Sequence, residues 1–139
     1  SFDYPIGNWD VSKVKDMAQM FIGSQYNQPL SGWNVSNVTQ MNAIFFSATS
    51  FNQNISNWIV TGLTYVNSAL AGLDQAFNYC GLNTLNYSNM LINWSSLPGL
   101  QSSIVMGATG LQYTISTAGA SRTYLTTTKN WVITGDSGV

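Results

Sequence analysis

Acidic and basic side chains are scarce in this chain, and their positions limit the chemistry it could perform. Lys, Arg, Asp and Glu make up 6% of the 139 residues, and histidine is absent. Asp10 and Asp16 are close enough in the sequence to form a carboxylate pair for general acid–base catalysis. Lys13 and Lys15 lie between them, however, and a solvated set of ion pairs is the commoner outcome of such a pattern. We therefore predict that the chain is not an enzyme.

Metal, phosphate and thiol chemistry are also poorly supported. Asp3 and Asp10 could offer oxygen ligands to Ca²⁺ together with nearby Asn side chains, but no loop is dense in ligands. The segment 107–110 is rich in glycine but lacks the lysine of a phosphate-binding loop, so we expect a turn there. Cys80 is the only cysteine and cannot form an internal disulfide. We expect no metal and no cofactor.

Five Asn-x-Ser/Thr sequences are candidate glycosylation sites. Such motifs carry glycans in secreted eukaryotic or viral proteins, and in a bacterial protein we expect them to be plain turn residues. The five asparagines are Asn34, Asn37, Asn54, Asn86 and Asn93.

A repeated motif fills the first part of the chain. The frames that begin at Phe2, Tyr26 and Phe51 share a Trp and a Val at the same later positions, and apolar residues then recur at every third position. The period is about 25 residues, within the range of leucine-rich repeats. We predict tandem repeats over residues 1–82, with units at 1–24, 25–49 and 50–75 and a degenerate fourth unit from residue 76.

Stacking would let such short repeats bury a core that one repeat cannot bury alone. We therefore predict an α/β repeat solenoid of the leucine-rich-repeat kind, with short parallel strands joined by turns, 3₁₀-helices or short helices. The strands are expected near residues 14–17, 38–41 and 63–66, and the helical segments after Met20, Ile44 and Ala69.

Two columns of equivalent residues suggest how the repeats would contact one another. Trp9, Trp33 and Trp58 predict an aromatic stack inside the core. A polar column predicts side chains that bond to the backbone of turns. Its members are Asp3, Asn27, Asn52 and Asn78.

The sequence from residue 83 departs from the repeat and predicts a C-terminal capping unit over residues 83–139. Tyr87, Met90, Leu91 and Trp94 follow the i, i+3, i+4, i+7 spacing of a helix. The segment 98–99 is Pro-Gly and ends that helix. Further elements are expected as a strand at 103–106, a helix at 118–127 and a strand at 131–133.

These motifs resemble a known family. The segments 6–14, 17–21 and 50–53 are similar to the BspA-like (DUF285) repeat, and the segments 89–94 and 107–113 are similar to the sequence that closes such arrays. The resemblance implies a leucine-rich-repeat-like solenoid on secreted or cell-surface proteins, with a role in adhesion and no catalytic residues. Ile59 replaces the Asp or Asn that follows the Trp in the other repeats, which argues against a uniform ligand-binding face.

Two non-catalytic functions follow from the repeats. In the first, the chain is an extracellular or cell-surface module that binds a protein or glycan through polar residues beside the expected strands. In the second, copies of the chain associate through the solenoid ends into a filament or surface layer. The expected ligand face comprises Lys15, Asp16, Gln19, Thr39, Gln40, Asn42, Thr64, Tyr65 and Asn67.

The overall charge and hydropathy argue against two other classes of partner. The formal net charge is −1, which gives little attraction for nucleic acid. No apolar run is long enough to span a bilayer, so we expect no membrane insertion. Because the chain opens inside a repeat, we expect it to be a piece of a longer protein.

Overall fold

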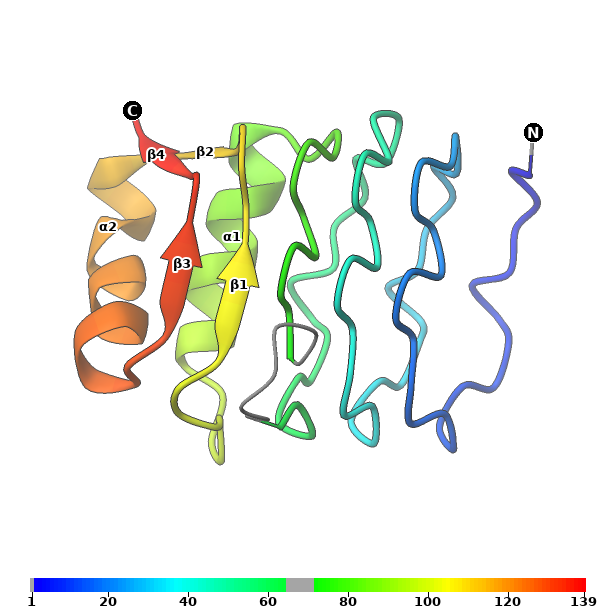
Figure 1. Ribbon diagram of the computed structural model, residues 1–139, viewed down its shortest axis with the longest axis horizontal. Coiled ribbons are helices and arrows are strands. Elements are labelled where there is room, and N and C mark those ends of the chain that lie inside the picture. The colour runs from blue at the N-terminus through cyan, green and yellow to red at the C-terminus, as the bar shows by residue number, and fades with distance from the viewer. Residues whose placement is uncertain (1, 65–71) are drawn as a thin grey trace.

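The computed structural model describes residues 2–64 and 72–139. Figure 1 shows successive segments of the chain lying side by side, with the N-terminus at one end of the molecule and the helices near the other. The helices are α1 (Thr84–Ser95), α2 (Ile115–Thr123) and a π-helical turn η1 (Tyr124–Thr128). The strands are β1 (Val105–Gly107), β2 (Gln112–Tyr113), β3 (Val132–Thr134) and β4 (Ser137–Gly138).

The strands pair into two small parallel sheets. β1 pairs with β3, with Val105 opposite Val132, and β2 pairs with β4, with Gln112 opposite Ser137. Among the described residues, the repeats add only isolated parallel bridges. These join Asp16 to Gln40, Gln40 to Gly72, and Leu73 to Met106.

The predicted leucine-rich-repeat solenoid is wrong. The described residues form a small domain with two α-helices and a few short parallel strands in two two-stranded sheets. The strands expected near 14–17 and 38–41 are reduced to single bridges, and Leu63 lies outside any strand. The segments after Met20 and Ile44 form turns in place of helices. Ala69, like Val66, lies outside the described residues.

Backbone conformation explains why the repeats form no strands. Gln19 and Gly23 both have φ of 61°, in the left-handed region. Residues of this kind interrupt an extended chain, so each straight stretch ends after one bridge. The chain makes successive four-residue turns, in which Ile22 N–H donates to the Gln19 carbonyl at 3.3 Å and Ser24 N–H to the Phe21 carbonyl at 3.1 Å. Positive φ recurs at Ala43, Ser47, Gln75 and Tyr79.

Aromatic columns fill the core between these turns. The rings of Phe21 and Phe45 stack at 5.3 Å, and those of Trp33 and Trp58 stack at 6.5 Å. The aromatic stack predicted for the Trp column is thus confirmed for Trp33 and Trp58. Trp9 differs from them, because 55% of its surface is exposed at the N-terminal end of the molecule.

The predicted elements after residue 83 are largely confirmed. α1 buries Tyr87, Met90, Leu91 and Trp94 on one face, as their spacing requires. Asn83 caps its N-terminus, because the Asn83 side-chain oxygen accepts the N–H of Asn86 at 2.9 Å. The predicted second helix corresponds to α2 and η1, and the two predicted strands to β1 and β3. The role of residues 83–139 as a cap, and the division of the repeats into units, stay predictions.

The polar column is present, with one change in its members. The Asp3 carboxylate accepts the Asn27 N–H at 2.8 Å, and the Asn27 side chain accepts the Asn52 N–H at 2.9 Å. Asn52 then accepts the N–H of Asn83 at 2.9 Å, so Asn83 and not Asn78 follows it in the column. The Asn78 side chain still bonds to backbone as predicted, because it accepts the Thr109 N–H at 2.9 Å. The third segment is longer than the first two. A prediction based on a constant repeat length therefore placed the fourth member of the column at Asn78, five residues before Asn83. We call Asp3, Asn27 and Asn52 the side-chain ladder.

In the part of the chain that the structure describes, every helix is too short, or too polar, to cross a bilayer.

Candidate binding surface

The residues of the predicted ligand face come from equivalent places in successive repeats. The parallel bridge between Asp16 and Gln40 makes these two residues neighbours. Gln19 N–H donates to the Asn42 carbonyl at 2.9 Å, which joins a second pair. Lys15, Asp16, Gln19 and Thr64 are exposed, Thr39 and Gln40 are half-buried, and Asn42 is buried. Tyr65 and Asn67 lie outside the described residues.

Local hydrogen bonds fix several of these side chains. The Asp16 carboxylate accepts the Ala18 N–H at 2.8 Å, and the Thr39 hydroxyl donates to the Lys15 carbonyl at 3.1 Å. Asp10 makes a similar turn, because it accepts both the N–H and the hydroxyl of Ser12, and these bonds lower the pKa of its carboxyl group. The two carboxylates considered for catalysis therefore each stabilise a turn.

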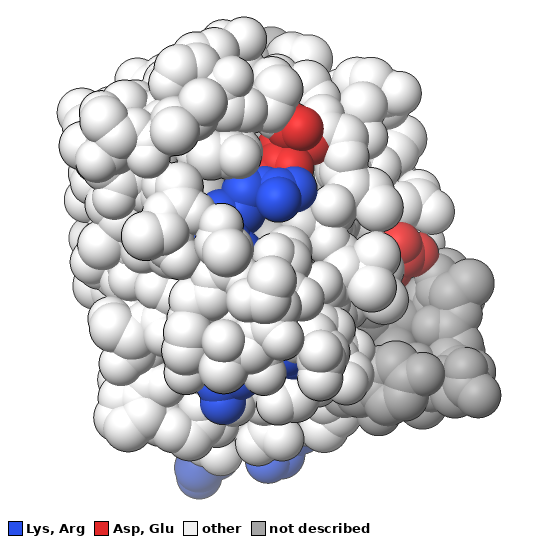
Figure 2. Space-filling view, turned by 90° about the vertical axis from the view of Figure 1, so that its left-hand side faces the viewer, with Lys and Arg blue, Asp and Glu red and all other residues white. Residues whose placement is uncertain are grey.

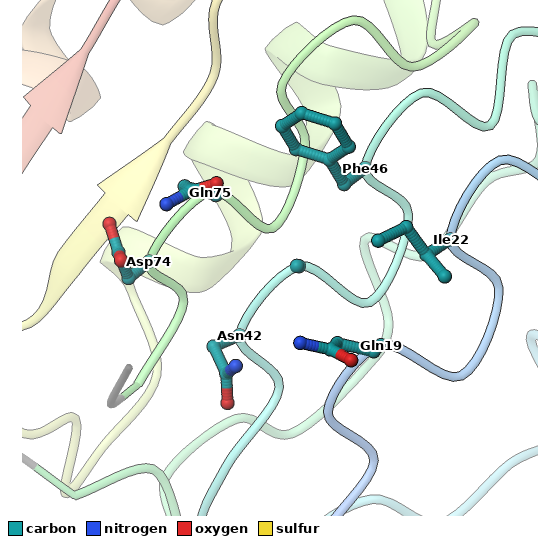
Figure 3. Close-up of a pocket in the computed structure, with 7 residues that line it drawn as sticks. Gln19, Ile22, Asn42, Phe46, Asp74 and Gln75 are labelled. Atoms are coloured by element: carbon teal, nitrogen blue, oxygen red, sulfur yellow. The ribbon is translucent and has the colours of Figure 1, made fainter. Parts of the chain in front are cut away.

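A shallow pocket of about 110 Å³ lies on this surface. Two members of the predicted face, Gln19 and Asn42, line it (Figure 3). Five further residues complete the lining, and the sequence analysis assigned none of them to the face. They are Ile22, Ala43, Phe46, Asp74 and Gln75. We call this the Ala43 pocket.

The backbone register explains how the Ala43 pocket forms. Gln19 N–H bonds to Asn42, and Ala43 N–H bonds to the Asp74 carbonyl at 2.8 Å. Gln19, Ala43 and Gln75 therefore occupy equivalent positions in three adjacent segments, and all three have positive φ. The middle segment carries the small residue, so its side chain leaves a hollow between the two glutamines. The sequence contains this Gln, Ala, Gln pattern at equivalent positions. Because the third segment is longer, equal spacing did not identify Gln75 as the equivalent of Gln19 and Ala43.

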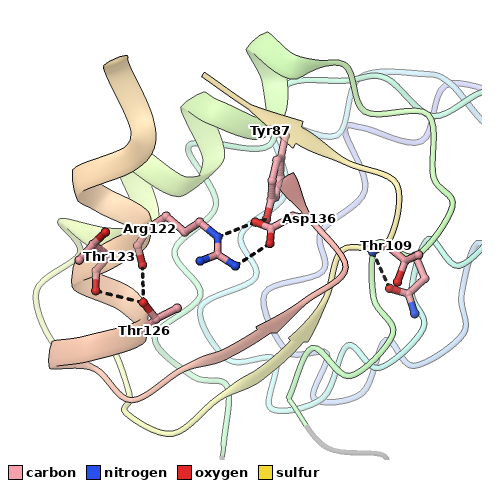
Figure 4. Close-up of polar contacts among 7 residues, drawn as sticks. Tyr87, Thr109, Arg122, Thr123, Thr126 and Asp136 are labelled. Carbon is pink, nitrogen blue, oxygen red and sulfur yellow. Dashed lines mark hydrogen bonds and ion pairs between the residues drawn. The ribbon is translucent and has the colours of Figure 1, made fainter. Parts of the chain in front are cut away.

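The strongest charge cluster lies elsewhere, between α1, α2 and the turn after β3 (Figure 4). The Asp136 side chain has no exposed surface and accepts two hydrogen bonds from Arg122, at 2.8 and 2.6 Å. Tyr87 donates its hydroxyl to the same carboxylate at 2.8 Å. The Arg122 guanidinium lies over the Tyr113 ring, 5.5 Å from its centroid.

These contacts leave the cluster with no free group for chemistry. Burial raises the pKa of the Tyr87 hydroxyl well above its usual range, and the Asp136 carboxylate adds to that rise. The hydrogen bond to Asp136 raises the pKa of Arg122. The Tyr87 hydroxyl therefore stays protonated and Arg122 stays charged at neutral pH. The arrangement joins elements and offers no general acid or base.

Thiol and metal chemistry find little support in the described residues. Burial raises the pKa of the Cys80 thiol to about 11, so it is protonated at neutral pH and is a poor nucleophile. Over residues 2–64 and 72–139, no three Cys, Asp, Glu or His side chains gather as a metal site.

The candidate glycosylation sites differ in their surroundings. Asn37 donates its side-chain amide to the Ser12 carbonyl at 2.7 Å, and Asn86 donates to Asn52. A glycan on either nitrogen would replace one of its two hydrogens and so compete with these bonds. Asn34, Asn54 and Asn93 are exposed.

Comparison with known protein families assigns the chain to one of them. The family model described as "Mycoplasma protein of unknown function, DUF285" matches residues 1–93. The chain belongs to the DUF285 family. No significant match was found among curated proteins or among solved structures.

Proposed function

We propose that this DUF285 chain is a non-catalytic binding module of a secreted or cell-surface protein. Its partner is a protein or a glycan, and the contact surface is the predicted ligand face together with the Ala43 pocket. The BspA-like surface-protein attribution within the family is part of this proposal. The observation that carries it is the register that brings Gln19 and Asn42, which are distant in the sequence, to the edge of one pocket.

The chemistry of the surface favours such a role. Uncharged polar groups cover most of it, since charged residues are only 6% of the chain. Figure 2 shows small blue and red areas on an otherwise uncharged end of the molecule. Amide and hydroxyl groups offer hydrogen-bond donors and acceptors without the desolvation cost of an ion. Such a surface suits a neutral polar partner better than nucleic acid.

The test compares a face variant with a matched control. Gln19, Gln40 and Thr64 would be replaced together by Ala, and the control would replace Gln101, Gln112 and Ser116, which are exposed elsewhere. Binding to immobilised extracellular-matrix proteins and to a glycan array is then measured. We expect binding by the face variant to fall at least tenfold, while binding by the control is unchanged.

Melting temperatures separate loss of contact from loss of folding. Surface substitutions away from the packed core typically change stability by less than about 0.5 kcal/mol, so both variants should melt within a few degrees of the parent. Equal binding by parent and face variant would show that the partner uses another surface. A parent chain that binds no matrix protein and no glycan would overturn the proposal.

A second candidate function is self-association through the N-terminal end of the molecule. Phe2, Trp9 and Met20 are 48%, 55% and 44% exposed there. Their equivalents in the next segment are among the most buried residues of the core, as Tyr26, Trp33 and Ile44. Exposed apolar side chains of this kind favour contact with another apolar surface.

A further inference from the structure

The floor of the Ala43 pocket is a single methyl group between two amides. Ala43 has φ of 52°, close to the values of 61° at Gln19 and 55° at Gln75. The three residues thus share one backbone conformation, and only the side chain differs. The hollow is therefore made by side-chain size and not by a change in the path of the chain.

Polar groups form one part of the wall. Gln19, Gln75 and Asn42 each carry an amide with both donor and acceptor atoms, and Asp74 adds a carboxylate. Asn42 is only 5% exposed, so its side chain is held within the wall of the pocket. These groups can donate to and accept from the hydroxyl groups of a ligand.

Apolar groups form the other part. Figure 3 shows Ile22 and Phe46 across the pocket from Asn42. Ile22 is 49% exposed, and the Phe46 ring is held edge-to-face against Tyr79, with centroids 6.0 Å apart. Tyr79 is itself 56% exposed and extends the aromatic surface beyond the pocket. The site therefore offers an apolar surface on one side and hydrogen-bonding groups on the other.

The negative charge of Asp74 in the lining argues against anionic ligands. Asp74 is the only ionisable residue in the lining, and no described cation pairs with it. A carboxylate can accept hydrogen bonds from neighbouring hydroxyls but repels an anion. The pocket thus disfavours sulfated, sialylated or uronic-acid ligands.

We propose that the Ala43 pocket binds one ring of a neutral glycan, with an apolar face of the sugar on Phe46 and Ile22 and its hydroxyls on the amides and Asp74. A pyranose ring has this two-sided chemistry, and aromatic rings pack against its C–H groups. The shallow pocket implies weak binding, with a dissociation constant on the order of 1 mM for one ring. This inference rests on the binding function proposed above and names its ligand class.

The side-chain amide signals of Gln19, Asn42 and Gln75 report on the site directly. The ¹⁵N-labelled chain would be titrated by NMR with maltotriose, cellotriose, mannotriose and triacetylchitotriose, and with a hyaluronan tetrasaccharide as the anionic control. We expect at least one neutral trisaccharide to shift these three amides and the hyaluronan fragment to leave them unchanged.

The substitution Ala43→Gln fills the pocket with a residue that the chain already uses at both neighbouring equivalents. Because Gln19 and Gln75 adopt the same φ, the variant should fold normally, which its amide spectrum would verify. We expect its affinity for the neutral trisaccharide to fall at least tenfold. The control Gln101→Ala alters an exposed residue far from the lining in sequence and should bind like the parent.

Three results would overturn the inference: no shift of the three amides with any neutral trisaccharide, equal binding by Ala43→Gln, or equal shifts with hyaluronan. A separate titration with arginine amide distinguishes this failure from failure of the binding function. Shifts with arginine amide alone would replace the glycan with a basic side chain of a protein partner. Loss of matrix and glycan binding by the parent chain would instead remove the binding function itself.

Discussion

Asp136 joins three parts of the C-terminal region through one fully buried carboxylate. It accepts hydrogen bonds from Tyr87 on α1 and from Arg122 on α2, while its own backbone lies between β3 and β4. A buried charge is tolerated because donors surround it, and each donor would be left unpaired without it. Arg122 keeps about a quarter of its side chain exposed, so water solvates part of its charge.

Replacing Asp136 with Ala should therefore be among the most damaging single changes in the chain. The Tyr87 hydroxyl would lose its acceptor inside the core, and Arg122 would lose its counter-ion. We expect the free energy of unfolding to fall by about 3–5 kcal/mol, the usual cost of removing one partner of a buried pair. Urea unfolding followed by tryptophan fluorescence measures this free energy.

The control Asp74→Ala removes a carboxylate that no described cation pairs with and should leave the midpoint of urea unfolding unchanged. Equal midpoints for both variants would contradict a structural role for Asp136.

The side-chain ladder connects the repeats to the first helix. Asn52 accepts the N–H of Asn83 and also an amide hydrogen of Asn86, both at 2.9 Å. Asn83 in turn caps α1. The ladder thus fixes where the turns end and where the helix begins, because it satisfies backbone donors that the helix cannot satisfy itself.

Asn52→Ala tests that connection. The Asn83 N–H would lose its acceptor, and because this bond is exposed we expect a loss of about 0.5–1.5 kcal/mol in the free energy of unfolding. Asn52→Asp keeps the accepting oxygen, and the chain already places Asp3 in this position, so this variant should retain most of the stability. Thermal unfolding followed by circular dichroism compares the three proteins. The ladder would have no energetic role if the Ala and Asp variants lost the same amount.

The elements also show what local sequence could predict. The spacing of Tyr87, Met90, Leu91 and Trp94 predicted α1 correctly, because a helical face depends only on neighbouring residues. The fold class was wrong because left-handed residues such as Gln19 and Ala43 look ordinary in a sequence, yet they limit the stretches expected near 14–17 and 38–41 to single bridges. Of the seven residues that line the Ala43 pocket, the predicted face contained only Gln19 and Asn42. The pocket's remaining members depended on the register of a longer third segment, which equal spacing could not supply.

At the scale of the whole molecule, the first segment exposes apolar side chains whose equivalents in the second segment are buried. The indole N–H groups of Trp33 and Trp58 donate to the Ile6 and Leu30 carbonyls of the preceding segment, at 2.9 and 3.0 Å. In the first segment, at the blue end of the chain in Figure 1, the side chains of Phe2, Trp9 and Met20 are 48%, 55% and 44% exposed. A low net charge of −1 adds little repulsion between copies.

Self-association should therefore depend on this end and increase with protein concentration. Replacing Trp9 and Met20 together by Ser removes exposed apolar surface without touching the packed columns, so we expect the parent to form larger species that the variant lacks. Light scattering coupled to size-exclusion chromatography, from about 1 to 100 µM, measures the mass. The control replaces Ile59 and Leu85, which are 50% and 66% exposed elsewhere, by Ser. Loss of larger species in both variants would indicate non-specific apolar contact, and a parent that stays monomeric throughout would remove self-association as a function of this end.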